Sequence, residues 1–256
     1  MERIDLGRYL AGNEYPGRGI AIAKSPDGRQ IFIGYWIMGR SENSRNRIFS
    51  PIPERGGVET RAADPAKLRD PSLIIYNPVL TLGKTHIVTN GDQTDTIFDA
   101  LCEGRSFEDA LRTRTFEPDG PNWTPRISGI VYADGSYALS ILKAGDVRGE
   151  HTLRCFFDYP HPSEGEGRFI STYRCNGSPI PSFEGEPLRF ACPRTVGEFA
   201  DMLWSNLDAD NKVSLFVRVI DLESGASGDM VYNKYSAVAS DLDDPEEPAL
   251  LDEEKN

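Results

Sequence analysis

Short apolar runs separated by turn residues dominate the pattern of hydrophobic and polar positions along this chain. Runs of this length, rich in Ile, Val, Phe and Tyr, are typical of β-strands. The dipeptides Asp27-Gly28 and Asp134-Gly135 each separate two consecutive runs and predict tight hairpins, because Gly readily adopts the positive φ of such turns. The runs predict strands at Gly19–Lys24, Ile31–Met38, Ser72–Asn77, Thr85–Asn90, Arg126–Ala133, Ser136–Lys143, His151–Tyr159, Arg168–Cys175 and Val213–Ile220.

Helical spacing of apolar residues is less frequent. In two places a helix start is marked by a capping-box pattern, in which Ser106 precedes Asp109 and Thr195 precedes Glu198 by three residues. The order of strands and helices lacks the regular alternation of a doubly wound parallel sheet. It predicts an α+β domain with antiparallel, hairpin-rich sheets and helices on their outer faces. The helices are expected at Asp92–Cys102, Ser106–Thr113 and Thr195–Leu207.

One segment shows neither the strand-like nor the helical pattern of apolar residues. Ser50–Pro71 contains four prolines and is expected to be a long loop, of the kind that is often functional or mobile. Elsewhere, a chain of 256 residues with 39% hydrophobic and 10% aromatic residues can form one large domain or two small ones. No internal repeat and no convincing linker divides it before its last segment.

The charge changes this picture at the C-terminus. Ser240–Asn256 holds eight acidic residues and one lysine, so it carries −7 of the formal net charge of −12 and leaves −5 for the rest. A segment with so little apolar surface to bury is expected to be disordered or loosely docked on the domain. The body is only mildly acidic, which argues against broad binding to nucleic acid, since that usually needs a basic face. A local anion site is still allowed.

The expected cellular location depends on targeting and membrane-spanning signals that are not found in the sequence. No apolar run reaches the roughly 18 residues that a membrane span needs, and the first residues lack the apolar centre of a secretory signal. The four cysteines form no CxxC pair and are expected to be reduced thiols in a cytoplasmic protein. These cysteines are Cys102, Cys155, Cys175 and Cys192.

Several common chemistries find no support. His86, His151 and His161 have no metal-ligand spacing among themselves or with the cysteines, so no metal is expected. His86 lies in a predicted strand and is interpreted as structural. The chain has no Walker loop, no dinucleotide fingerprint and no GxSxG elbow.

The stretch GRSENSRNR, which follows a predicted strand, is the first candidate for chemistry. Its guanidinium groups, from Arg40, Arg45 and Arg47, can bind phosphate oxygens two at a time, and Ser41 and Asn46 can complete such a cradle. The alternative is a solvated loop with surface ion pairs. The sequence alone leaves both readings open.

Polar residues also follow two other predicted strands, Tyr76-Asn77 in one case and Asn90-Gly91 in the other. Gly91 leads directly into a predicted helix start, where free backbone N–H groups can bind an anion. Asp92 or Thr94 could instead be an ordinary helix cap.

The segment FEPDGPNWTPRISG is the third candidate. Its three prolines stiffen a loop before a strand, and rigid loops at strand ends are where sites tend to be built. The alternative is a plain turn with a surface ion pair. Its polar side chains are Glu117, Asp119, Asn122, Thr124 and Arg126.

Together these segments resemble the archaeal-type IMP cyclohydrolase family. The matching pieces are YPGRGIAIAK, YWIMGRSENSRNR, YNPV, VTNGDQTD and NWTPRISGIV. The resemblance runs from about Tyr15 to about Tyr235, and it is strong through Val131 and weak after Cys155. It divides the chain into an N-terminal extension (1–14), a cyclohydrolase-like domain (15–238) and an acidic tail (239–256).

The resemblance implies the four-layer αββα fold of N-terminal-nucleophile hydrolases, with two antiparallel sheets flanked by helices. It implies ring closure of a formylated aminoimidazole carboxamide ribotide to IMP with loss of water, without a metal or cofactor. The chain departs from true N-terminal-nucleophile enzymes, because Tyr15-Pro16 stands where a processed nucleophile would be expected and no Ser, Thr or Cys follows Met1. Autoprocessing and a covalent intermediate are therefore not implied.

The resemblance also suggests roles for the candidates. The substrate would be a small purine ribonucleotide monophosphate, with its phosphate held by Arg40, Ser41, Arg45 and Arg47. Tyr76 is the candidate for proton transfer. Either Glu117 or Asp119 would act as base or tune a neighbour, and the choice stays open. Arg126, Asn77, Asn90 and Asn122 would orient the carboxamide and stabilise the oxyanion.

The expected catalytic residues are thus Arg40, Tyr76, Glu117, Asp119, Asn122 and Arg126. The expected substrate-binding residues are Arg18, Ser41, Arg45, Asn46, Arg47, Asn77, Asn90, Gly91, Asp92, Thr94 and Thr124. Arg18 matches a family position without an assigned role. A homo-oligomer is left open, as are two alternative functions: an enzyme of the same fold with another ribotide or amide substrate, and a nucleotide-binding protein without catalysis.

Overall fold

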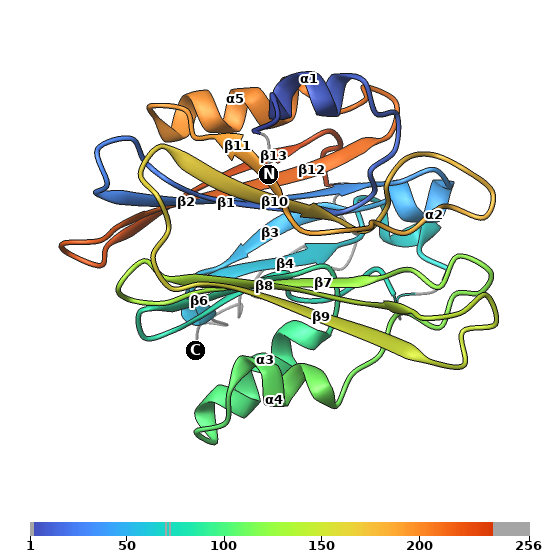
Figure 1. The fold of residues 1–256 in the computed structure, drawn as a ribbon. Coiled ribbons are helices and arrows are strands. Elements are labelled where there is room, and N and C mark those ends of the chain that lie inside the picture. The colour runs from blue at the N-terminus through green and yellow to red at the C-terminus, as the bar shows by residue number, and fades with distance from the viewer. Residues whose placement is uncertain (1–2, 70, 72, 238–256) are drawn as a thin grey trace, which may run out of the picture.

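Two antiparallel sheets packed face to face form the centre of the computed structural model, which describes residues 3–69, 71 and 73–237 (Figure 1). In spatial order, the six-stranded sheet contains β11 (Leu188–Ala191), β10 (Glu166–Ser171), β1 (Gly19–Lys24), β2 (Gln30–Met38), β12 (Lys212–Asp221) and β13 (Ser227–Asn233). The seven-stranded sheet contains β3 (Ile48–Ile52), β4 (Gly57–Arg61), β5 (Val79–Leu82), β6 (Thr85–Thr89), β7 (Arg126–Val131), β8 (Tyr137–Ala144) and β9 (Thr152–Tyr159).

Helices cover both outer faces (Figure 1). Helices α1 (Leu6–Ala11) and α5 (Val196–Asn206) lie on the six-stranded sheet, and α3 (Gln93–Cys102) and α4 (Phe107–Arg112) lie on the seven-stranded sheet. The predicted four-layer αββα arrangement is therefore confirmed. Shorter helical pieces are α2 (Glu42–Arg45), η1 (Pro53–Arg55) and η2 (Pro65–Lys67).

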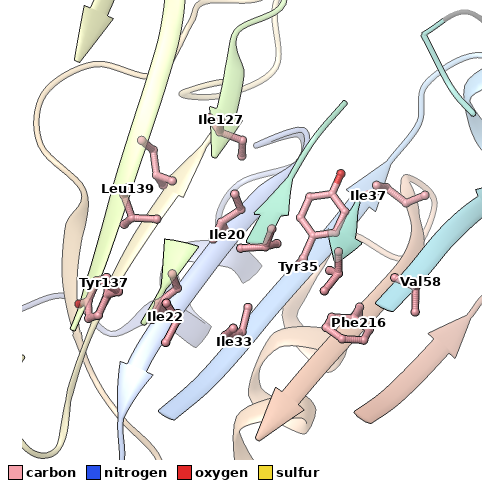
Figure 2. Close-up of a cluster of buried hydrophobic side chains, with 14 of the residues drawn as sticks. Ile20, Ile22, Ile33, Tyr35, Ile37, Val58, Ile127, Tyr137, Leu139 and Phe216 are labelled. Atoms are coloured by element: carbon pink, nitrogen blue, oxygen red, sulfur yellow. The ribbon is translucent and has the colours of Figure 1, made fainter. Parts of the chain in front are cut away.

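The main core lies between the sheets, because alternate residues of each strand face inward. Ile20, Ile22 and Ile33 of one sheet meet Ile127 and Leu139 of the other, and all five are buried (Figure 2).

A second core lies under α5. There Gly34 of β2 lets the helix approach closely, since a Cβ atom at this position would lie 2.5 Å from Leu203 Cδ1. Leu6 and Leu10 of α1 are buried in the same core, so part of the predicted N-terminal extension packs onto the domain.

Several local predictions are confirmed. Gly28 and Gly135 adopt positive φ (74° and 83°) in the β1–β2 and β7–β8 hairpins. Both capping boxes form, at the starts of α4 and α5.

All four cysteines lie in the described residues and are free thiols there. Among the described residues, no helix is long and apolar enough to span a membrane. The predicted acidic tail, 239–256, lies outside the described residues.

The predicted strand Ser72–Asn77 is wrong for its described residues. Residues 73–77 form a turn, a bend and irregular backbone, and the next strand, β5, begins only at Val79. Thr60 supplies the physical reason. Its hydroxyl oxygen accepts a hydrogen bond from the Tyr76 N–H at 2.8 Å, and its own N–H donates to the Tyr76 carbonyl at 2.8 Å. The segment is therefore held by one threonine rather than by a strand partner.

The predicted loop Ser50–Pro71 is also wrong, because it contains the end of β3 and the whole of β4. β3 is an edge strand of its sheet, and Pro51 is tolerated there because an edge does not require every backbone N–H. The elements that the pattern did not predict are α1, α2, η1, η2, β3, β4, β5, β11 and β13.

Candidate active site

A cavity of about 310 Å³ opens at one end of the sandwich, where β1 and β7 begin and β2 and β10 end. In Figure 1 this end carries α2, at the right. The residues that line the cavity come from segments far apart in the sequence. Among them are eight of the predicted site residues: Arg18, Arg40, Ser41, Arg47, Glu117, Asp119, Asn122 and Thr124.

A buried ion pair forms one wall of this cavity. The Nη2 atom of Arg18 donates to both carboxylate oxygens of Glu117, at 2.8 and 3.0 Å, and the two residues are 9% and 3% exposed. Burial opposes charge on Arg18, but Glu117 and nearby tyrosines outweigh it and hold the pKa of Arg18 well above its usual range. For Glu117, burial outweighs Arg18 and raises the pKa of the carboxyl. Such an environment suits a group that exchanges protons.

Two buried guanidinium groups keep unused donors. Arg47, 2% exposed, donates from Nε to the Ser44 carbonyl at 2.8 Å and from Nη2 to the Met38 carbonyl at 3.1 Å. Its Nη1 atom and the Nε atom of Arg18 have no hydrogen-bond partner among the described residues. Buried donors normally find partners, so this cavity is prepared for a group with several acceptor oxygens.

The turn between β2 and β3 shapes the rest of this wall. Ser41 caps α2 and forms a reciprocal hydrogen-bonded box with Ser44, which fixes the turn. Arg40 extends across the cavity mouth, where Nη1 donates to Asn176 Oδ1 at 2.6 Å and to the Gly177 carbonyl at 3.0 Å. Arg40 therefore joins this turn to the segment that follows β10.

Tyr76 is not among the residues that line the cavity. It is almost fully buried, at 7% exposed, and its hydroxyl lies 2.7 Å from the hydroxyl of Tyr35 in β2. Burial raises the pKa of Tyr35 well above its usual range, so Tyr35 stays a neutral phenol. Tyr76 also interacts electrostatically with the guanidinium groups of Arg18 and Arg47. The contact with Tyr35 fixes the hydroxyl of Tyr76 beside the two cations.

The segment before β7 presents polar groups on the opposite wall. The carboxylate of Asp119 accepts the Thr124 N–H at 2.6 Å and also accepts the Thr124 hydroxyl. The Thr124 hydroxyl oxygen lies 2.5 Å from the hydroxyl oxygen of Tyr173, which follows β10. Asn122 Oδ1 accepts the N–H of Ile180 at 3.1 Å. These contacts tie the segment before β7 to the one after β10.

Arg126, a predicted catalytic residue, does not line the cavity. Its Nη1 atom donates to Gln93 Oε1 at 2.7 Å and lies 2.6 Å from Asp92 Oδ1. Asp92 also pairs with Arg114 at 2.5 Å, and the two arginines outweigh burial and lower the pKa of Asp92. Burial lowers the pKa of Arg126. A Cβ atom at Gly91 would lie 2.5 Å from Arg126 Nη1 and 2.7 Å from Gln93 Oε1, so a larger residue would displace the ends of these two side chains.

The other polar residues around the start of α3 serve the same junction. Asn90 donates from Nδ2 to the Pro125 carbonyl at 2.9 Å and accepts the Ile127 N–H at 2.8 Å. Thr94 donates to the Gly91 carbonyl at 3.1 Å, and Asp92 makes no side-chain cap. Asn77 donates to Asp95 at 3.2 Å. None of these residues lines the cavity.

Arg45 and Asn46 face a different cavity, of about 410 Å³. Arg45 donates from Nε to the Gly39 carbonyl at 2.9 Å and from Nη2 to Asn211 Oδ1 at 3.0 Å. Asn46 pairs with the backbone of Asp64, at 2.8 and 2.7 Å. The predicted arginine cluster is therefore divided between two cavities.

Sequence reasoning missed several residues of the wall. Tyr15 and Tyr173 line it as a stacked pair with ring centroids 5.9 Å apart, and the guanidinium of Arg40 lies 5.1 Å from the centroid of Tyr15. Tyr15 stands in the matching piece YPGRG, which was a usable signal. Tyr173 lay inside a predicted strand that in fact ends at Ser171, so no signal marked it. The others are Met38, Ser44, Leu73, Ile74 and Ile180.

The described residues contain no group of three or more His, Cys, Asp or Glu side chains placed to hold a metal ion. The cavity instead combines cations with unused donors, a buried carboxylate and several hydroxyl groups. This set can bind a phosphate, orient a polar heterocycle and move a proton.

Comparison with known proteins agrees with this chemistry. A family model described as "IMP cyclohydrolase-like protein" matches residues 15–225. Three similar curated proteins are named IMP cyclohydrolase. The one from Methanosphaera stadtmanae is 29% identical over 171 residues, 63% of this chain and 75% of the relative. The one from Methanothrix thermoacetophila is 27% identical over 67% of this chain and 80% of the relative. The one from Methanopyrus kandleri is 33% identical over 62% and 75%.

Proposed function

The chain belongs to the IMP cyclohydrolase-like protein family, and on this basis we propose that it is an IMP cyclohydrolase acting in purine biosynthesis. The reaction closes the second ring of 5-formamidoimidazole-4-carboxamide ribotide and releases water to give IMP. The observation that carries the proposal is the Arg18–Glu117 pair, a buried carboxylate beside guanidinium donors without partners. A site that only bound a nucleotide would need the cations and not the carboxylate.

The substrate's phosphate binds, in this proposal, against Arg47, Arg40, Ser41 and Ser44. Arg47 supports this because its Nη1 donor is buried and unused. A dianionic phosphate offers the acceptors that this donor lacks. Arg45 was expected to take part, but its hydrogen bonds to the Gly39 carbonyl and Asn211 direct it elsewhere. We therefore leave Arg45 and Asn46 out of the phosphate site.

Ring closure joins the carboxamide nitrogen to the formyl carbon within one molecule, so orientation supplies much of the rate. Glu117 takes the proton that the attacking nitrogen loses. Its raised pKa brings it nearer to neutral pH, where a carboxylate is a more effective base. Arg18 lies against Glu117 and stabilises the negative charge that develops on the formyl oxygen.

The oxyanion first takes up the proton that Glu117 accepted and becomes a hydroxyl group. The former formamide nitrogen then loses its hydrogen to Glu117 as the C=N bond of the new ring forms, and the hydroxyl group leaves as water, which requires a second proton. Tyr76 is proposed to deliver it, since its hydroxyl is held by Tyr35 beside the cations. Glu117 is proposed as base rather than Asp119, because burial raises the pKa of Glu117, whereas the carboxylate of Asp119 accepts the N–H and the hydroxyl of Thr124 and so shapes the segment before β7. Asn122 is proposed to orient the segment after β10 through Ile180.

Arg126, Asn90 and Asp92 are proposed as supports of the site rather than substrate contacts. Asn90 bonds to the backbone of Pro125 and Ile127, and Asp92 pairs with Arg126; these contacts fix the start of β7 and so place the segment that carries Glu117. We further propose that residues 15–238 form the catalytic domain, that it acts without a metal or cofactor, and that it lies in the cytoplasm. The four free cysteines support that location.

The test is the absorbance change when purified protein is mixed with the formylated ribotide in the presence of EDTA. Formation of IMP establishes metal-independent cyclohydrolase activity. If there is no turnover but IMP raises the melting temperature, the protein binds purine nucleotides and acts on another ribotide or not at all. If neither is seen, the chain has kept the fold of the family without its function.

A further inference from the structure

Three side chains form a line of hydrogen bonds that ends at the cavity and that the proposed chemistry does not use. Asp119 lies at one end, Thr124 in the middle and Tyr173 at the other end. Thr124 and Tyr173 are 1% and 3% exposed, and all three line the cavity. The line joins the segment before β7 to the residues that follow β10, so it crosses between the two sheets.

The direction of these hydrogen bonds follows from the chemistry of the groups. An ionised carboxylate only accepts, and Asp119 already accepts the Thr124 N–H at 2.6 Å. The Thr124 hydroxyl has one hydrogen, and Asp119 takes it. Thr124 can therefore only accept from Tyr173, so the phenol hydrogen of Tyr173 points toward Thr124 and away from the cavity.

The consequence concerns the phenol oxygen. Its one hydrogen is engaged, so it can offer the cavity only lone pairs. Burial raises the pKa of Tyr173 above its usual range, which keeps the phenol neutral and its hydrogen in place. Tyr15 stacks on the ring of Tyr173 at 5.9 Å and restricts its rotation. Tyr173 is therefore a fixed acceptor in a wall that is otherwise rich in donors.

We propose that the phenol oxygen of Tyr173 accepts a hydrogen bond from the reacting carboxamide N–H of the substrate, with Thr124 and Asp119 as positioning residues. This inference rests on the proposed function. The carboxamide nitrogen carries two hydrogens. Tyr173 holds one of them, which remains on the nitrogen and becomes N1–H of IMP, and the other passes to Glu117 as the bond to the formyl carbon forms.

The location of Glu117 supports this division. Its backbone N–H donates to the Thr124 carbonyl at 2.9 Å, so the base and the two positioning residues, Thr124 and Asp119, belong to the same segment before β7. Tyr173 as acceptor and Glu117 as base can therefore each contact one of the two hydrogens of a planar amide. With its own hydrogen donated to Thr124, Tyr173 favours a substrate that presents an N–H donor at this position.

The kinetic test uses variants that differ by single polar atoms. Tyr173→Phe removes the acceptor. Thr124→Val removes the hydroxyl that links Tyr173 to Asp119 while keeping the shape of the side chain. Both are expected to lower kcat/KM by about tenfold or more, with kcat itself reduced, because the contact positions the reacting group. Thr124→Ser restores the hydroxyl and is expected to recover most of the activity. The control is Tyr137→Phe, a buried tyrosine of β8 at the opposite end of the sandwich.

Three kinetic outcomes would overturn the inference. In one, Tyr173→Phe matches wild type. In another, Thr124→Ser is as impaired as Thr124→Val, so that packing and not the hydroxyl matters. In the third, KM rises while kcat is unchanged, which assigns Tyr173 to a non-reacting donor such as a ribose hydroxyl.

A binding test separates this inference from the proposed function, because it needs no turnover. IMP carries N1–H, whereas purine riboside 5′-monophosphate has only a lone pair at N1. The wild-type protein is expected to bind IMP about tenfold more tightly than purine riboside 5′-monophosphate, and the Tyr173→Phe variant is expected to lose most of that preference. If the preference persists in Tyr173→Phe, the inference fails even though the enzyme is active. If wild type shows the preference but no turnover, the proposed function fails and the acceptor role stands.

Discussion

Arg45 and Arg47 are two residues apart, yet they face different cavities. Arg47 lies after the end of α2 and is pulled inward by the carbonyls of Ser44 and Met38. Arg45 lies in the helix and is directed outward by Asn211, more than 160 residues away. The sequence could predict that guanidinium groups gather here. It could not predict their division, because contacts distant in sequence decide it.

This division makes a prediction at the residue scale. Arg47→Met keeps the volume of the side chain but removes the unused donor, and it is expected to weaken IMP binding by about tenfold or more, since a charge-assisted hydrogen bond to phosphate is lost. Arg45→Met, the matched control, is expected to change affinity by less than about threefold. Calorimetric titration with IMP measures both, and melting temperatures show whether each variant is folded. Equal losses in the two variants would place the phosphate elsewhere.

Glu117 carries a second prediction. Glu117→Gln keeps the shape and removes the base, so kcat is expected to fall by about 100-fold or more while IMP still binds. Glu223→Gln, at an exposed position, is the control. In the wild type, the carboxylate must be ionised to act. The kcat/KM profile should therefore fall as the pH drops through the raised pKa of Glu117, above the usual value of about 4.3. An unchanged kcat in Glu117→Gln would require another base.

At the scale of elements, local chemistry predicted more than hydrophobicity did. The hairpins after Asp27 and Asp134 and the capping boxes of α4 and α5 depend on residues within a few positions of each other, and all are present. The strands β3 and β4 were missed because prolines made the segment resemble a loop. Pairing between these two strands, which a local pattern does not contain, decides their structure. The apolar run before β5 was misread for the corresponding reason, since Thr60 of another strand holds it as a turn.

The capping box of α5 allows a test at this scale. Thr195 accepts the Glu198 N–H at 3.2 Å, and Glu198 accepts the N–H groups of Thr195 and Arg194. Thr195→Ala is expected to lower the free energy of unfolding by about 1 kcal/mol, with catalysis unchanged, because α5 covers the sheet far from the cavity. Thr195→Ser should retain the cap and most of the stability. Urea unfolding measures both variants, and equal losses would show that the hydroxyl is not what stabilises α5.

At the scale of the whole molecule, the two sheets are joined by more than apolar contacts. Arg218 of β12 is buried between them and donates to Thr81 Oγ1 at 2.7 Å, to the Gly56 carbonyl at 3.0 Å and to Asp229 at 2.7 Å. Its Nη1 atom also lies 3.1 Å from Nδ1 of His86 in β6. The sequence indicated that His86 is structural. It did not indicate the partner, which comes from the opposite sheet.

The tautomer of His86 follows from this contact. A guanidinium group only donates, so Nδ1 of His86 must accept, and the ring is neutral with its hydrogen on Nε2. Protonation would place two donors against each other. Burial and the positive charge of Arg218 accordingly lower the pKa of His86 to about 4.

This low pKa predicts how stability depends on pH. Above pH 6.5, the ordinary value, His86 is neutral in both the folded and the unfolded chain, and its contribution is complete. As the pH falls from 6.5 towards 4, the unfolded chain binds the proton first, so the free energy of unfolding decreases, by about 3 kcal/mol over that window. His86→Asn keeps an acceptor for Arg218 but cannot titrate. Urea unfolding at several pH values should therefore give a shallower pH dependence for His86→Asn than for wild type. His161→Asn, which changes an exposed histidine, should keep the wild-type dependence. If His86→Asn follows the same curve as wild type, the acid sensitivity of the sandwich arises elsewhere than at the junction of its two sheets.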